Sequence, residues 1–268
     1  MKILAPFEKL FTSYVLITLN LVIILAAEFV GGGVYFAETG LVHGIAIVFV
    51  GLIIVRIFSD YAFSDHILRG FLKIQLAFFL FFGLVHVYEY LGLHFLMLSD
   101  EVVELSVAFS YLLWFIGVIL ALEFVFRIYR KKSVILTAIL SALLAIGFLG
   151  LIGANISPAF AENLPAWFPI AILIGIVGFG VAGILSIRNI REIMPVFGEY
   201  SHYAIPAMVL VIFAAFSEYF ESTGTLQAFG ISDTQNLYIA HFLVYAAASL
   251  LLIGFGKLKK PTGIYAEM

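Results

Sequence analysis

The sequence of 268 residues contains no cysteine and few charged residues. Without thiols, the chain cannot form disulfides, thiolate metal sites or a cysteine nucleophile. Charged residues make up 12% of the chain and hydrophobic residues 63%, whereas an average soluble domain has about 25% and about 45–50%. This composition excludes a disordered chain and a nucleic-acid-binding protein, because both need more charge. It predicts an all-α integral membrane protein.

Several catalytic signatures are also missing from the sequence. It has no glycine-rich phosphate loop, no His-Glu-x-x-His zinc motif and no Gly-x-Ser-x-Gly nucleophile elbow. Any chemistry must therefore come from residues that lie apart in the sequence. We leave open whether the protein is an enzyme.

Long apolar runs recur along the whole chain. A helix needs about 20 apolar residues to cross the hydrocarbon core, and open strands cannot satisfy their backbone there. We expect the first run to remain in the membrane, because no small-residue cleavage site follows it ahead of a soluble domain. The sequence predicts a polytopic protein with about eight transmembrane helices, at 11–31, 41–58, 73–95, 104–126, 134–154, 167–187, 203–222 and 236–256.

Basic residues are missing from every second loop of this arrangement. With eight spans, all 14 lysines and arginines fall on the side that carries both termini. The other side has only acidic residues, namely Glu38, Asp100, Glu101, Glu104, Glu162 and Asp233. Basic loops stay in the cytoplasm, so we expect a multi-pass protein of the plasma membrane with cytoplasmic N- and C-termini. The basic face should also favour anionic lipid in the surrounding bilayer.

A shift of 132 residues superimposes the eight predicted spans as two sets of four. Glu89 then falls on Glu221. Four spans per unit would make this a parallel internal repeat, with its axis along the membrane normal. We therefore expect a first four-helix unit at 1–132, a second at 133–260 and a short cytoplasmic tail at 261–268.

Ionisable residues within the predicted spans gather in the outer half of the bilayer. Each costs about 2.5–3.5 kcal/mol at the bilayer centre, so each needs a reason to be there. Glutamate and histidine three residues apart on facing helices form di-metal carboxylate sites in helical bundles. Imidazole with carboxylate suits zinc, iron or manganese. We therefore expect a divalent metal site at His86, Glu89, Glu218, Glu221 and His241.

The expected site has one structural requirement. Spans three and seven must touch, because His86 and Glu89 lie on one and Glu218 on the other. Three further residues, Glu28, His43 and His94, lie within about two turns of a span end, where side chains commonly reach the headgroups. We expect this role for each of them singly, although the His43 imidazole is also placed to complete the metal site.

The outer-leaflet cluster predicts transport of a divalent metal or metal-dependent chemistry. Three alternatives remain open. The first is a b-type haem protein for electron transfer, with His86 and His241 as axial ligands. The second is a proton-coupled carrier of a small solute. The third is a non-catalytic membrane subunit or sensor, in which the cluster only forms hydrogen bonds. The expected partners are the lipid bilayer and a metal ion or small solute, and not a nucleic acid.

Overall fold

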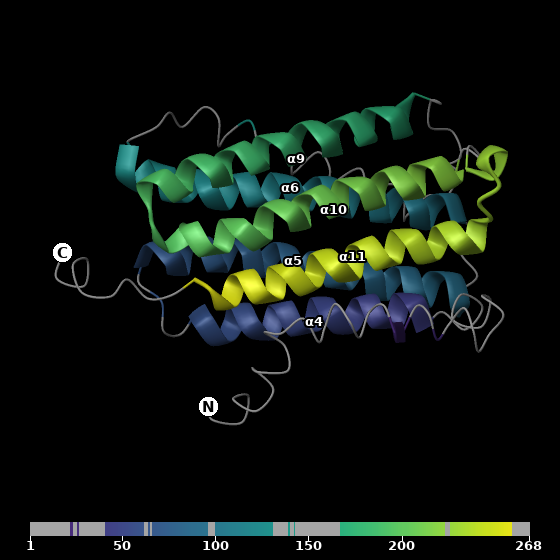
Figure 1. The fold of residues 1–268 in the computed structure, drawn as a ribbon, viewed down its shortest axis with the longest axis horizontal. Helices are drawn as coiled ribbons and strands as arrows, with labels where there is room; N and C mark the ends of the chain where they lie inside the picture. Colours follow the sequence, from purple (N-terminus) through teal and green to yellow (C-terminus); the bar gives the residue numbers. More distant parts are fainter. Residues whose placement is uncertain are drawn as a thin grey trace.

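A computed structural model of the chain is a bundle of long helices (Figure 1). It describes residues 41–61, 64, 66–95, 100–130, 167–222 and 226–258, and the isolated positions 22, 23, 26, 139 and 142. Within these ranges, 6 helices are long and apolar enough to cross a membrane, and there is no strand. They are α4 (Leu41–Tyr61), α5 (His66–His94), α6 (Asp100–Arg130), α9 (Phe168–Ile193), α10 (Val196–Ser222) and α11 (Asp233–Gly256).

The six helices confirm the expectation of an all-helical membrane protein. They fall on six of the eight expected spans, and most extend beyond the apolar run into charged residues such as Arg69 and Glu199. Such turns suit the headgroup region, where charged side chains meet water. The expected spans at 11–31 and 134–154 and the tail at 261–268 lie outside the described residues. The count of eight, the repeat and the two-unit division therefore stay predictions.

The described helices pack as a closed ring. Each one makes its most extensive contacts with two neighbours, in the order α4, α5, α6, α9, α10, α11 and back to α4, and α6 also touches α10. Helices α6 and α11 are the most buried, whereas α9 is the least. The contact between α11 and α4 joins the last described helix to the first long one, and it creates the site described below.

Glycine allows α5 and α6 to approach closely. A methyl group added to Gly70 would collide with the ring of Phe124, and one added to Gly117 would collide with the ring of Phe78. Small residues at such contacts are typical of helix pairs in membranes, where association depends on close packing. This packing fixes the position of α5, which carries two residues of the site.

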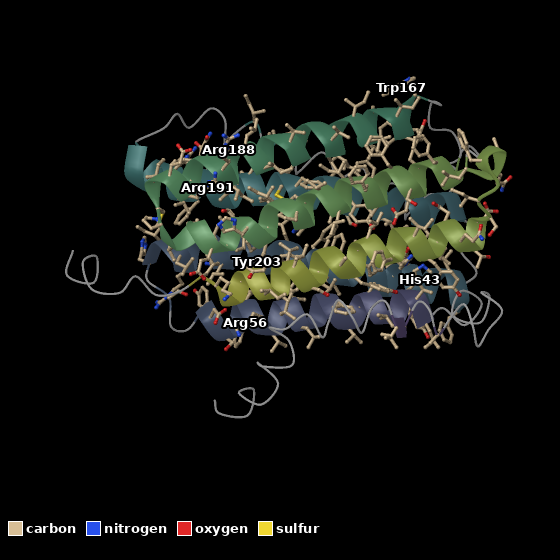
Figure 2. The ribbon with its side chains drawn as sticks, viewed as in Figure 1. His43, Arg56, Trp167, Arg188, Arg191 and Tyr203 are labelled. Atoms are coloured by element: carbon tan, nitrogen blue, oxygen red, sulfur yellow. The ribbon has the colours of Figure 1, made fainter. Side chains whose placement is uncertain are left out.

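The two ends of the bundle differ in charge. Figure 2 shows Arg56, Arg188 and Arg191 toward one end, and His43 toward the other. At the basic end, Arg56 Nε donates to Asp60 Oδ2 at 2.9 Å. The asymmetry found in the loops of the sequence therefore separates the two ends of the described bundle. The cytoplasmic placement of the basic end and the choice of the plasma membrane remain predictions from the sequence.

Candidate metal centre

Three helices bring His43, Glu89 and His241 together at the end of the bundle away from the arginines (Figure 2). Their potential ligand atoms all lie within 4.8 Å of one another. The three residues are buried, with 4%, 8% and 6% of their surface exposed. They come from α4, α5 and α11, which are consecutive in the ring. The ring closure therefore assembles the group.

His241 is positioned by the start of α11. Ser232 and Gln235 form a capping box that begins this helix, and His241 lies about two turns further along. Its Nδ1 is 2.9 Å from the carbonyl oxygen of Leu237. Because a carbonyl only accepts, Nδ1 carries the proton and the lone pair of Nε2 is available to a metal. The backbone of α11 thus selects the tautomer that a metal ligand needs.

His43 is positioned by the contact between α4 and α11. The Tyr245 hydroxyl donates to the carbonyl oxygen of Val42 at 2.5 Å, and the Tyr245 ring stacks on Phe49 with centroids 5.6 Å apart. These contacts fix the backbone next to His43 against α11. The rings of His43 and His241 then meet edge to face with centroids 4.8 Å apart.

Glu89 links the two imidazoles to a third. Its Oε1 lies 3.4 Å from Nε2 of His43, and its Oε2 lies 2.8 Å from Nδ1 of His86. His86 is one turn earlier on α5 and is 2% exposed. It therefore holds one carboxylate oxygen and leaves the other directed at His43. Among the described residues, Nε2 of His86 has no hydrogen-bond partner.

Two imidazoles and one carboxylate form a recurrent ligand set. His₂Glu binds catalytic zinc with one position open, and two histidines with one carboxylate bind non-haem iron(II). The arrangement can therefore hold one divalent ion, and His86 can orient the carboxylate from outside, as hydrogen-bond partners of metal ligands do.

Glu218 lies beside this group and not in it. The Tyr111 hydroxyl of α6 donates to Glu218 Oε1 of α10 at 2.9 Å. The Phe82 ring contacts both groups, because it packs against His86 at 4.4 Å and against Tyr111 at 5.5 Å. Glu221 lies in α10, but its side chain is outside the described ones.

The expected contact between spans three and seven occurs at the opposite end of the bundle. Phe71 of α5 meets the rings of Phe197 and Tyr200 of α10, at 5.0 and 5.9 Å. In the ring as a whole, α5 lies between α4 and α6. The structure thus joins Glu89 to His43 and His241, and it joins Glu218 to Tyr111.

Two residues of the site received little weight in the sequence analysis. His43 was expected to reach the headgroups because it is close to the start of its helix, yet it is 4% exposed. Tyr111 was not singled out, since one tyrosine in an apolar helix is unremarkable by spacing. The packing of α11 on α4 reveals the position of His43 beside His241. The packing of α10 on α6 reveals the bond from Tyr111 to Glu218.

No protein-family model, no curated protein and no solved structure shows a significant match to the chain. The function is therefore argued from the geometry of the site alone.

Proposed function

We propose that this membrane protein binds one divalent transition-metal ion, zinc or iron(II), at His43, Glu89 and His241. The observation that carries the proposal is the convergence of three buried ligand atoms from three helices within 4.8 Å. Ligands of a tetrahedral ion with bonds of about 2.0–2.1 Å lie about 3.3 Å apart. Small side-chain movements would therefore close the group around an ion.

A purely structural role accounts for the site less well. A buried carboxylate needs a hydrogen-bond partner, and His86, at 2.8 Å from Glu89, is sufficient for this purpose. The approach of His43 and His241 to the same carboxylate is then unexplained, because two further imidazoles add desolvation cost in an apolar bundle. A divalent ion would use both rings and the free carboxylate oxygen at once.

The site supports a resident ion better than a transported one. His86 fixes the orientation of Glu89, and such outer partners preorganise ligands for a bound metal. Three protein ligands leave a fourth position open for water or a substrate oxygen, as in catalytic zinc sites. We therefore favour a metal-dependent reaction on a lipid or small molecule that reaches the outer half of the bundle. Metal transport, haem binding and proton-coupled transport remain the alternatives from the sequence.

Elemental analysis of the purified protein tests the proposal. After loading with zinc or iron(II), the wild type should retain about one metal ion per chain. His43→Ala, Glu89→Gln and His241→Ala should each lose it while keeping the helical circular dichroism spectrum. His202→Ala is the matched control, because His202 is an exposed histidine on α10. The proposal fails when the wild type holds no metal, or when Glu89→Gln and His241→Ala hold as much as the wild type.

A further inference from the structure

Helix α9 packs one face into the bundle and leaves the opposite face exposed. Gly183 lies on the packed face, because a methyl group there would collide with Met208 of α10. The exposed face is a row of residues spaced by three or four positions, namely Ile170, Ile174, Gly178, Val181 and Leu185. A methyl group on Gly178 would meet nothing within 4 Å, so this glycine leaves open space between exposed apolar side chains.

The row ends at two arginines. Arg188 continues it with the same spacing at the basic end of the bundle and is exposed, and Arg191, which is partly exposed, follows three residues later (Figure 2). Residues three apart on a helix are neighbours on its surface, with Cβ atoms about 5–6 Å apart. The exposed face of α9 therefore joins an apolar surface to a pair of guanidinium groups.

These two arginines differ from the others in the described part of the chain. The other arginines with described side chains bind within the protein, Arg56 to Asp60, Arg69 to the carbonyl oxygen of Ser64 and Arg127 to Glu123. Arg188 and Arg191 form no ion pair or hydrogen bond with their side chains among the described residues, and this includes Glu192, one turn beyond Arg188. Their guanidinium groups are therefore available to an external anion.

We propose that the exposed face of α9 binds an anionic phospholipid, with the phosphate at Arg188 and Arg191 and an acyl chain along Val181 and Gly178. Guanidinium groups bind phosphate through two parallel hydrogen bonds, and basic side chains near the headgroups attract anionic lipid. A second copy of the chain paired through this face would bring like charges together. The inference does not depend on the proposed metal site.

Quenching of tryptophan fluorescence by brominated lipid tests the inference on the full chain. A Val181→Trp reporter lies seven residues from Arg188, about 10 Å along the helix and within the same leaflet. With Trp167→Phe in the same chain, the other tryptophan is Trp114, which is buried. In phosphatidylcholine vesicles with a rising share of brominated phosphatidylglycerol, the reporter should show a preference for phosphatidylglycerol. Arg188→Gln should lower that preference about fivefold, the effect of one basic side chain near an anionic surface.

Helix α5 provides the matched control. Lys73 is exposed on α5, and Leu80, seven residues further along that helix, is exposed as well. A Leu80→Trp reporter should therefore show the weaker preference of an apolar face that ends at a single lysine. Lys73→Gln should leave the preference at the α9 reporter unchanged.

Several outcomes would overturn the inference. Equal preference at the two reporters would show that the basic end attracts anionic lipid without a specific site, and so would an unchanged preference when Arg188→Gln and Arg191→Gln are combined. Loss of the preference on adding inorganic phosphate at constant ionic strength would assign the arginines to free phosphate. Absence of quenching at the α9 reporter would indicate that a second copy covers this face. If Arg188→Gln does not fold, the comparison of the two reporters with both arginines present still decides.

Discussion

Substitutions of His86 and Glu89 should rank in opposite order for their effects on zinc affinity and on the stability of the metal-free protein. His86 holds Glu89 Oε2 at 2.8 Å, while Oε1 faces His43 at 3.4 Å. His86→Ala removes only the outer partner and should lower zinc affinity about 10–100-fold. Glu89→Gln removes a charged ligand. Structural zinc sites bind with about 10–16 kcal/mol, roughly 2.5–4 kcal/mol for each of four ligands, so the zinc affinity of this variant should fall about a hundred- to thousandfold.

The stability of the metal-free protein should follow the reverse order. A buried carboxylate that loses a hydrogen-bond partner costs at least about 1–3 kcal/mol, because it stays buried without that bond. His86→Ala leaves the Glu89 carboxylate in the bundle with one partner fewer, whereas Glu89→Gln leaves neutral groups. His86→Ala should therefore be the less stable variant without metal. Zinc should restore more of its stability, since binding to the folded state raises the free energy of unfolding.

Chelator competition gives the zinc affinities, and thermal unfolding in detergent with and without zinc gives the stabilities. His202→Ala, on the exposed surface of α10, should match the wild type in both assays. Equal loss of affinity in the two site variants would show that His86 is itself a ligand. Wild-type affinity in both would refute the reasoning from the geometry of this pair.

Three further predictions concern the surroundings of the site. Tyr245→Phe removes the hydrogen bond to the Val42 carbonyl oxygen and should lower the free energy of unfolding by about 1 kcal/mol. An unchanged unfolding midpoint would show that this bond does not stabilise the contact between α11 and α4. Zinc affinity should fall as the pH is lowered, because imidazole and carboxylate ligands must be deprotonated to bind a metal ion; a zinc affinity that stays constant in chelator competition until the protein unfolds in acid would exclude these ligands. Gly117→Ala should destabilise the protein by about 1–3 kcal/mol through the collision with Phe78, whereas a methyl group at Gly51 meets nothing within 4 Å and serves as the control in the same thermal assay.

The six described helices could be predicted from the sequence because apolar runs of membrane length carry the signal directly. The ends of these helices could not be predicted, since the helical turns in the headgroup region are polar and resemble loops in sequence. The closure of the ring by α11 on α4 could not be predicted from the sequence either. Short loops predict that consecutive helices pack together, but the contact of Tyr245 with Val42 joins residues 203 apart. That contact depends on side-chain packing and leaves no local pattern.

Only the part of the site that lies within one helix could be predicted from the sequence. His86 and Glu89 are three apart on one helix, and this spacing correctly predicts that they share a face and pair. The expected site required Glu218 on span seven to meet His86 and Glu89 on span three, whereas in the ring α5 lies between α4 and α6. His43 illustrates the limit most clearly. Nothing in its own helix distinguishes a histidine that reaches the headgroups from one that a distant helix covers.

The closure of α11 on α4 has a consequence for biogenesis. Membrane helices leave the ribosome in sequence order, so His43 and Glu89 enter the bilayer long before His241 is synthesised. Until α11 has been inserted, Glu89 lacks its neighbour His241, and the proposed ion would lack one ligand. An early chain would therefore hold the proposed ion only weakly. Occupancy of the proposed site would mark a chain in which α11 has been inserted, and metal supply would act after that step.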